Sequence, residues 1–312
     1  MSRLEDAAEA QRRRMELLME DLKPLIPYFE KKNTTDIFVY GSGNVSVEDF
    51  KEGVYNTDIV LSVNDRMRII NGLASISNTP IDKWEKPTLE SIIPKYNIRT
   101  TAIIDPWLLE PQIVFRKPPD EIYTLEDYVK TNRLSKEQYD KILLHLEKRS
   151  NIVISGGTGS GKTSFINALL DKIHELRPED RLYIIEDVPE LQCKSIYKTQ
   201  VCIRKEQAVY AIETAFRWKP KRIIFGEIRS GVMAAELLEA WISGHPGNFT
   251  TIHANNAASA IERFKGLLRQ VIFGTLPDLS WYIQLIVHIS SKPDFGPVVT
   301  EVSTFEEISG VQ

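Results

Sequence analysis

A glycine-rich stretch carries the clearest chemistry in this sequence. Residues 156–163 match the phosphate-binding pattern G-x-x-x-x-G-K-[ST] at every constrained position. Glycines let the backbone turn tightly and direct its N–H groups at phosphate oxygens, and the N-terminus of a following helix adds positive potential. The pattern therefore predicts a nucleoside triphosphate site formed by Gly156, Gly157, Thr158, Gly159, Ser160, Gly161, Lys162, Thr163 and Ser164.

Two side chains of this loop have specific expected roles. Lys162 can reach the β- and γ-phosphates, and the Thr163 hydroxyl can ligate Mg²⁺. The loop follows an apolar run at 152–154 and opens a helical pattern at 163–174, which is the context that the motif requires. A glycine-rich loop that only caps a helix is the plain alternative, and both flanking elements count against it. We expect ATP and Mg²⁺ as ligands.

Polar residues follow three other apolar runs of the second half of the chain. Glu186 follows the first run, Glu227 the second and His253 the third. Ligands of α/β sheets lie at the carboxyl ends of the strands, so we expect these side chains to meet beside the glycine-rich loop. Hydrolysis needs a carboxylate that orients or deprotonates water, and often a second that holds the hydration shell of the magnesium ion.

Glu227 and Glu186 are the candidates for those two roles, and which of them is the principal base stays open. His253 could donate a hydrogen bond to the γ-phosphate. The usual place of the magnesium-shell aspartate is occupied by Gly226, so Glu186 or Asp187 is expected to supply that carboxylate, with Glu186 placed beside Thr163 as the metal ligands. Taken singly, each carboxylate could be a helix cap or a surface charge, and the histidine could be structural. Their joint occurrence with the loop favours the catalytic interpretation.

The elements that must position these residues alternate between apolar runs and helical patterns. This alternation is typical of a parallel sheet with helices on both faces, and we assign residues 135–312 to such an α/β domain. Strands are expected at 151–155, 181–186, 200–203, 222–226, 248–252 and 286–290. Helices are expected at 163–174, 207–218, 231–242 and 257–271.

The first part of the chain has a different pattern. A helical segment over residues 1–32 precedes a smaller α+β domain over 33–118, and residues 119–134 form a linker. Within the smaller domain one helix is expected at 64–76. Strands are expected at 36–40, 44–47, 57–63, 98–104 and 112–116.

Composition limits the classes of protein that fit. A length of 312 residues supports two domains, and a formal net charge of −4 argues against a protein that coats nucleic acid over its whole surface, while leaving room for a local basic channel. Two cysteines, Cys193 and Cys202, are too few for a zinc site. We expect a cytoplasmic protein, because the sequence has no signal peptide and no apolar run long enough for a membrane span.

Four segments in a fixed order carry a resemblance to a known family. They resemble the Walker A motif, Asp box, Walker B motif and His box of the secretion ATPases, at 152–163, 185–192, 223–229 and 244–255. Among these ATPases the sequence most resembles the TrbB-type conjugative transfer ATPases of type IV secretion systems, through residues 116–118, 123–128 and 190–193. The resemblance extends from about residue 99 to 263 and is weak before residue 90.

The resemblance implies a homo-oligomeric ring, a hexamer, whose protomers combine an N-terminal domain with a RecA-like C-terminal P-loop domain. Nucleotide would be clamped between the two domains, and arginines of the N-terminal domain would contact its phosphates. The matching positions are Arg99 and Arg116. A guanidinium that arrives on domain closure would stabilise transition-state charge, whereas surface salt bridges are the plain alternative. Further partners would be inner-membrane components of a type IV secretion or conjugation machine, with the protein peripheral to that membrane.

The leading hypothesis is an ATPase that couples hydrolysis to domain and ring motion, powering conjugative DNA transfer, type IV secretion assembly or substrate translocation. A pilus extension or retraction ATPase of the same superfamily is one alternative. A nucleic-acid motor of the RecA or helicase type is another, although no basic stripe interleaved with aromatic residues is visible. Direct nucleic-acid binding stays open. A scaffold that uses ATP only to lock its ring would bind tightly with negligible turnover.

Overall fold

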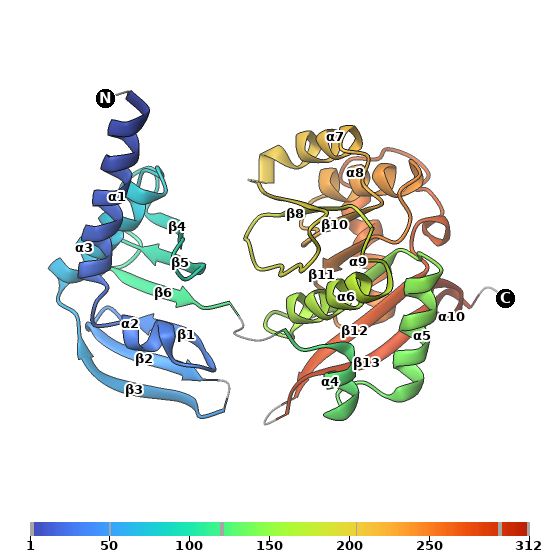
Figure 1. The fold of residues 1–312 in the computed structure, drawn as a ribbon, viewed down its shortest axis with the longest axis horizontal. Helices are drawn as coiled ribbons and strands as arrows, with labels where there is room; N and C mark the ends of the chain where they lie inside the picture. The colour runs from blue at the N-terminus through green and yellow to red at the C-terminus, as the bar shows by residue number, and fades with distance from the viewer. Residues whose placement is uncertain (1–2, 50, 119–121, 204, 293–294, 311–312) are drawn as a thin grey trace. The chain divides into compact units, whose positions relative to one another are not determined.

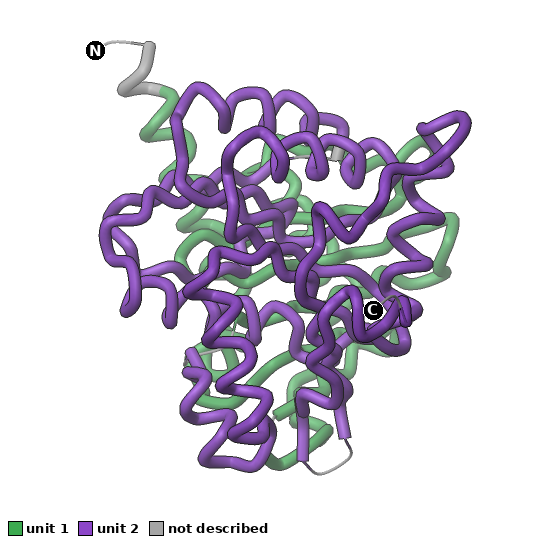
Figure 2. Tube along the Cα trace, turned by 90° about the vertical axis from the view of Figure 1, so that its right-hand side faces the viewer, with its two compact units in different colours: residues 1–121 green, residues 122–312 purple. Residues whose placement is uncertain are grey.

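The computed structural model describes residues 3–49, 51–118, 122–203, 205–292 and 295–310. The chain forms two compact units, residues 1–121 and 122–312, which are coloured separately in Figure 2. Residues 119–121, at the start of the expected linker, lie outside the described residues. Within the described ranges, no helix combines the length and apolar character that crossing a membrane requires.

Unit 1 is a six-stranded antiparallel sheet with helices, as Figure 1 shows. The strand order is β3-β2-β1-β6-β5-β4. Its helices are α1 (Arg3–Asp21), α2 (Ile26–Glu30) and α3 (Val63–Ile76). Its strands are β1 (Thr34–Val39), β2 (Asn44–Asp49), β3 (Gly53–Val60), β4 (Thr88–Ile93), β5 (Ile98–Ile103) and β6 (Gln112–Arg116). The sequence pattern missed β4, a short run between Pro87 and Pro94 that the sheet recruits as its edge.

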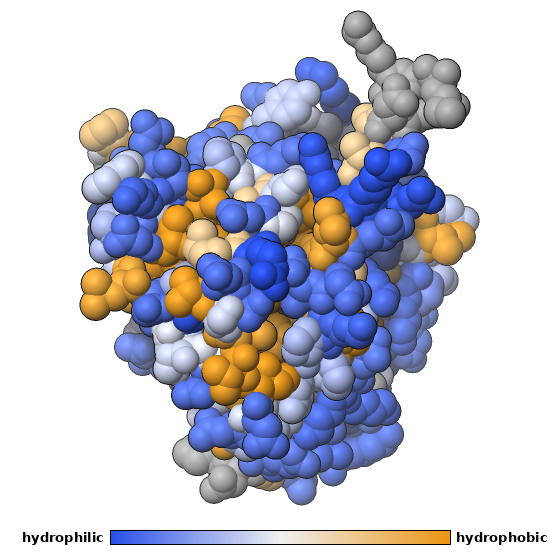
Figure 3. All heavy atoms as spheres, turned by 90° about the vertical axis from the view of Figure 1, so that its left-hand side faces the viewer, coloured by the Kyte–Doolittle hydropathy of each residue, from blue (hydrophilic) through white to orange (hydrophobic). Residues whose placement is uncertain are grey.

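The core of unit 1 lies between its helices and its sheet. Leu18 of α1, Leu22 in the turn after α1, and Ile69 and Leu73 of α3 are fully buried against apolar strand residues. A capping box begins α3, because the Ser62 side chain accepts from the Asp65 amide and Asp65 accepts from the Ser62 amide. Figure 3 shows groups of apolar residues among hydrophilic ones, which is usual for a protein surface.

Unit 2 is a seven-stranded sheet in the order β13-β12-β7-β11-β10-β8-β9. Neighbouring strands are parallel except β12 and β13, which form an antiparallel hairpin. The strands are β7 (Ile152–Gly156), β8 (Leu182–Glu186), β9 (Lys198–Cys202), β10 (Arg222–Phe225), β11 (Phe249–Ile252), β12 (Leu285–Lys292) and β13 (Gly296–Thr304). The α-helices are α4 (Leu125–Lys130), α5 (Lys136–Glu147), α6 (Lys162–Leu176), α7 (Ala208–Arg217), α8 (Gly231–Ile242), α9 (Ala257–Leu268) and α10 (Phe305–Ser309).

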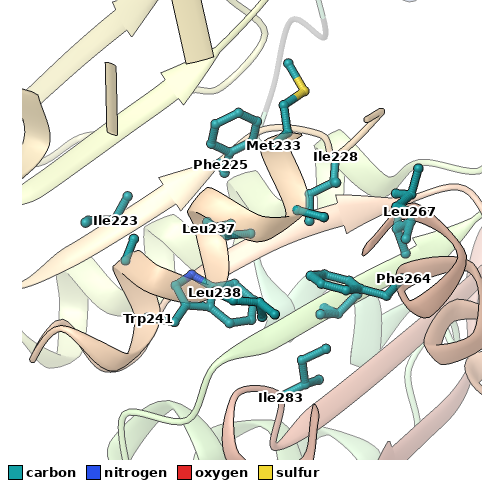
Figure 4. Close-up of a cluster of buried hydrophobic side chains, with 14 of the residues drawn as sticks. Ile223, Phe225, Ile228, Met233, Leu237, Leu238, Trp241, Phe264, Leu267 and Ile283 are labelled. Atoms are coloured by element: carbon teal, nitrogen blue, oxygen red, sulfur yellow. The ribbon is translucent and has the colours of Figure 1, made fainter. Parts of the chain in front are cut away.

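Helices cover both faces of this sheet, which confirms the predicted α/β fold class. Alternate residues of the central strands point to opposite sides. Ile223 and Phe225 of β10 pack with α7, α8 and α9, whereas Ile224 between them packs with α4, α5 and α6. Figure 4 shows the first of these two clusters, with Trp241 of α8 and Phe264 of α9 among its members. Such strands are buried on both faces, which explains their continuous apolar sequence.

A buried ion pair fixes the amino end of β10. The Arg222 side chain is 1% exposed, its Nε lies 2.9 Å from Asp180 Oδ2, and its Nη1 donates to the Gly247 carbonyl at 2.8 Å. Asp180 also accepts from Arg149 Nη2 at 2.6 Å. Burial alone would raise the pKa of Asp180, but the two guanidinium groups outweigh it and hold the pKa below its ordinary value.

Asp180→Asn is expected to lower the free energy of unfolding by about 3–5 kcal/mol at pH 7, because it leaves the buried Arg222 charge without its counter-ion. The pKa of Asp180 is lower in the folded protein than its ordinary value near 3.8. The stabilisation is therefore fully present when the pH is above 3.8, and it is lost as the pH falls through the pKa of the folded state. Urea unfolding at pH 7 and at stepwise lower pH measures both effects, and the difference from wild type should shrink in acid.

The matched control is Asp140→Asn, which breaks the exposed Lys136–Asp140 pair of α5 at 2.6 Å. Exposed pairs contribute about 0–1 kcal/mol, so this variant should unfold close to wild type. Equal effects of the two substitutions would contradict a structural role for the buried pair.

Candidate nucleotide-binding site

The glycine-rich loop connects β7 to α6 and is packed against the β12–β13 hairpin. Gly159 and Gly161 have φ angles of 69° and 89°, in the left-handed region that side chains disfavour. A Cβ atom at Gly161 would lie 2.6 Å from Cγ of Pro297, and one at Gly156 would lie 2.4 Å from the Ile289 carbonyl oxygen. The backbone turn therefore favours glycine at 159, the lack of space requires it at 156, and both reasons apply at 161.

The ammonium group of Lys162 is hydrogen-bonded to the backbone of this loop. Its Nζ donates to the carbonyl oxygens of Gly156 at 3.0 Å and Gly157 at 2.7 Å, and lies 3.3 Å from His253 Nδ1. Burial lowers the pKa of Lys162. A half-desolvated ammonium on a glycine-rich loop is suited to exchange its carbonyl partners for phosphate oxygens.

A chain of polar side chains continues from Lys162 across the carboxyl ends of β11, β10 and β8. His253 Nε2 lies 2.7 Å from Glu227 Oε1. Arg229 donates to Glu227 Oε2 at 2.7 Å and to Asp187 Oδ2 at 2.5 Å. An imidazole that accepts from Lys162 at Nδ1 carries its proton at Nε2, the ring nitrogen nearer to Glu227, although Glu227 Oε1 accepts no hydrogen bond in this arrangement. The fold thus brings Lys162, Glu227 and His253 together. The positions of these residues in the sequence led us to expect that their side chains would meet.

Arg229 belongs to this series of polar contacts, but the sequence analysis gave it no role. Its guanidinium connects the Walker B segment to the acidic segment after β8, which only the packing of β8 against β10 makes possible. In the sequence, the only indication of this role was the position of a basic residue two places after Glu227.

Glu186 occupies a different environment from Glu227. Its side chain is 3% exposed; Oε2 accepts from the backbone amides of Glu190 and Leu191, each at 2.9 Å, and Oε1 accepts from Gln200 at 2.5 Å. Burial raises the pKa of Glu186 despite these hydrogen bonds. Both oxygens are therefore engaged in holding the loop that follows β8.

That loop carries the carboxylate that lies at Thr163. Thr163 Oγ1 donates to Glu190 Oε2 at 3.3 Å. Asn167 of α6 fastens the same loop, since its Nδ2 donates to the Glu190 carbonyl and its Oδ1 accepts from the Gln192 amide. Sequence reasoning included Glu190 in the acidic segment but gave it no role. A hydroxyl and a carboxylate beside the phosphate loop are the oxygen ligands that Mg²⁺ prefers, so these residues fit that ion.

Arg99 and Arg116 belong to unit 1, where they are direct cross-strand partners on β5 and β6. Like charges opposite each other destabilise a sheet, and each arginine has a carboxylate nearby that offsets this. Arg116 Nε donates to Asp36 Oδ1 at 2.9 Å, and Arg99 Nη2 lies 3.8 Å from Glu90 Oε1. The structure therefore places the two predicted arginines side by side on one face of the sheet.

Comparisons with known proteins identify the family and the fold of the chain. The family described as "Type II/IV secretion system protein" matches residues 15–287. The chain is 31% identical to a probable conjugal transfer protein TrbB of Sinorhizobium fredii, covering 85% of this chain and 81% of the relative. It is 33% identical to the conjugal transfer protein TrbB of Rhizobium radiobacter, covering 78% and 77%. The ATPase DotB of Legionella pneumophila has a similar fold, with a TM-score of 0.67, 20% identity and coverage of 93% and 82%.

Proposed function

This chain belongs to the TrbB-type conjugal transfer ATPases of the type II/IV secretion system protein family, and we propose that it converts ATP hydrolysis at the P-loop into domain and ring motion. The observation that carries this proposal is the chain of contacts from Lys162 through His253 to Glu227. It supports the proposal because an ammonium, an imidazole and a carboxylate lie together at one edge of a parallel sheet.

In this proposal each residue of the site has one task. The loop amides and Lys162 bind the phosphates, and Glu227 orients or deprotonates the attacking water. His253 donates to the γ-phosphate when its single N–H turns from Glu227 to the nucleotide. Arg229 is a positioning residue that keeps Glu227 beside Asp187. A magnesium ion bound through Thr163 and Glu190 would neutralise phosphate charge. Glu186, for which we expected the metal role, is better suited to position Glu190, because both of its oxygens are engaged within the loop.

For Arg99 and Arg116 the proposal is contact with the nucleotide phosphates, as the family resemblance implies. Their pairing on neighbouring strands supports it, because two guanidinium groups on one face offer donors matched to phosphate oxygens. Asp36 would then keep Arg116 in place.

The cellular setting is also part of the proposal. We assign the protein to a homo-oligomeric ring, a hexamer, that works with inner-membrane components of a type IV secretion or conjugation machine. Its place would be the cytoplasmic face of that membrane, with peripheral attachment. The support is the chain's similarity to the two conjugal transfer proteins over most of their lengths.

Light scattering with and without a non-hydrolysable ATP analogue, alongside turnover measurements, tests this function. We expect the analogue to favour a particle near six times the 35.7 kDa of one chain, together with magnesium-dependent ATP turnover. A monomer under all conditions would contradict the ring. Stimulation by single-stranded DNA that falls steeply with salt would instead favour a nucleic-acid motor.

A further inference from the structure

A buried histidine of β12 lies directly beside the strand that enters the P-loop. His288 is 4% exposed and is the register partner of Ser155 on β7, the residue before Gly156. Its Nδ1 lies 2.9 Å from the hydroxyl oxygen of Ser155, which is fully buried. Its Nε2 lies 3.3 Å from the Ser290 hydroxyl oxygen. Both ring nitrogens therefore have hydroxyl partners, although this histidine has no part in the proposed chemistry.

A β-bulge turns a carboxylate toward the same histidine. The pairing of β12 with β13 shifts by one residue between His288 and Ile289, which leaves Thr300 as the extra residue of β13. The Thr300 hydroxyl donates to the His288 carbonyl at 3.4 Å. Val299 packs into the cluster of α4, α5 and α6, and alternation along an unbroken strand would place Glu301 on that same face. The bulge instead places Glu301 opposite His288, on the face that α9 covers.

Glu301 fastens the start of the helix that follows His253. Its Oε2 accepts from the amide of Ala257, the first residue of α9, at 3.1 Å. A helix N-terminus has free N–H groups and a positive potential, so a carboxylate suits this position. Only three residues separate His253 from Ala257 along the chain. Glu301 therefore fixes the backbone just beyond His253.

His288 thus lies between two parts of the site that must act on the same nucleotide. On one side, Ser155 leads into the P-loop that carries Lys162. On the other side, Glu301 holds the helix that follows His253. Lys162 Nζ and His253 Nδ1 lie 3.3 Å apart, although they follow different strands, β7 and β11. A shift of either support would change that distance.

The imidazole of His288 can hold both supports without adding a charge. Burial lowers the pKa of His288; Glu301 acts against this effect and Lys162 acts with it. The ring is therefore neutral at pH 7, with one N–H and one acceptor nitrogen. It donates to one of its two serine hydroxyls and accepts from the other, which fixes its orientation.

We propose that His288 is a positioning residue of this ATPase, which sets the distance between the P-loop and His253 through its bond to Ser155 and its pairing with Glu301. This inference rests on the proposed P-loop function. The loop amides and Lys162 belong to one short segment, so nucleotide binding should depend little on His288. The alignment of Lys162 with His253 joins two strands and should depend on it, because a misplacement of about 1 Å can slow a chemical step about 100-fold.

Single-turnover kinetics with magnesium-ATP, and calorimetry with a non-hydrolysable ATP analogue, test the proposal on the full-length protein. His288→Leu fills similar space and removes both hydrogen bonds. We expect its chemical step to slow about 10- to 100-fold, while the Kd for the analogue stays within about threefold of the wild-type value. His288→Asn can keep the bond to Ser155, because its amide group reaches the position of Nδ1, and should restore most of the rate.

Ser155→Ala removes the other half of the same hydrogen bond. Combined with His288→Leu, it should slow the chemical step by clearly less than the product of the two single effects, because both substitutions remove one interaction. Single effects that multiply in full would show that His288 does not act through Ser155 and would overturn the proposal.

His145→Leu is the matched control. His145 Nδ1 also lies 2.8 Å from a serine hydroxyl, that of Ser150, but this pair precedes β7 at the opposite edge of the sheet. The control should leave both the chemical step and the Kd unchanged. A thermal melt of each variant identifies unfolded protein, and if His288→Leu is unfolded, Ser155→Ala takes its place with the same expected result.

Three results would overturn the positioning role and leave the P-loop function intact. They are an unchanged chemical step in His288→Leu, equal slowing by His288→Leu and His145→Leu, and a loss that appears only in the Kd. A wild-type protein that binds and hydrolyses no ATP would remove the P-loop function and this inference together.

Discussion

Lys162→Ala is expected to lower ATP turnover about 1,000-fold or more and to weaken nucleotide binding. Removing one oriented donor from a reacting oxygen costs about 100- to 1,000-fold, and Lys162 supplies a full positive charge in addition. Its Nζ already lies on the loop, at 2.7 Å from the Gly157 carbonyl oxygen. Steady-state turnover and calorimetry with magnesium-ATP measure the two losses.

Stability provides an independent check on this variant. Burial lowers the pKa of Lys162 in the folded protein below its ordinary value near 10.5. Any stabilisation by this group is therefore present when the pH is above 10.5, and it is lost when the pH falls below the pKa of the folded state. At pH 7 to 8 the buried ammonium is therefore a cost that alanine removes. We expect the melting temperature of Lys162→Ala to equal or exceed that of wild type.

Lys265→Ala is the matched control, since it removes a lysine of α9 that is paired with Glu262 at the surface at 2.8 Å. It should leave turnover and binding unchanged. Turnover of Lys162→Ala within tenfold of wild type would refute the phosphate-binding role of the loop.

Glu227→Gln is expected to bind magnesium-ATP nearly as tightly as wild type while turnover falls about 100- to 10,000-fold. Glutamine keeps the size of the side chain and one acceptor oxygen for Arg229, but it cannot take a proton from water. Its Nε2 would also face the Nε2–H of His253, which lies 2.7 Å from the carboxylate in the wild-type site. Single-turnover measurements with saturating nucleotide separate the chemical step from binding.

Two further substitutions divide the roles of the carboxylates. Glu190→Gln should raise the magnesium concentration needed for half-maximal turnover, because Glu190 lies at Thr163. Glu186→Gln keeps an acceptor for the amides of Glu190 and Leu191 and should have the smallest effect of the three. A chemical step that is slowed most by Glu186→Gln, with Glu227→Gln near wild type, would assign the base to Glu186 instead.

Short-range patterns explain which parts of the fold the sequence predicted. Continuous apolar runs between helical patterns identified the strands of unit 2, because strands covered by helices on both faces bury every side chain. Residues 231–242 were predicted as a helix and form α8 with the same bounds. In unit 1, β4 escaped prediction because flanking prolines masked its pattern, and its pairing with β5 is what makes it a strand.

The sequence alone determined the glycine-rich loop and predicted phosphate binding there, since its glycines, Lys162 and Thr163 lie within eight consecutive residues and local geometry suffices. It also indicated that Glu227 and His253 belong at the same sheet edge. Only the tertiary structure decided that Glu190 rather than Glu186 faces Thr163, that Arg229 joins Glu227 to Asp187, and that Arg99 opposes Arg116. These contacts depend on strand order and register, and a difference of a few ångströms in how a loop is folded decides which of two neighbouring carboxylates points into the site.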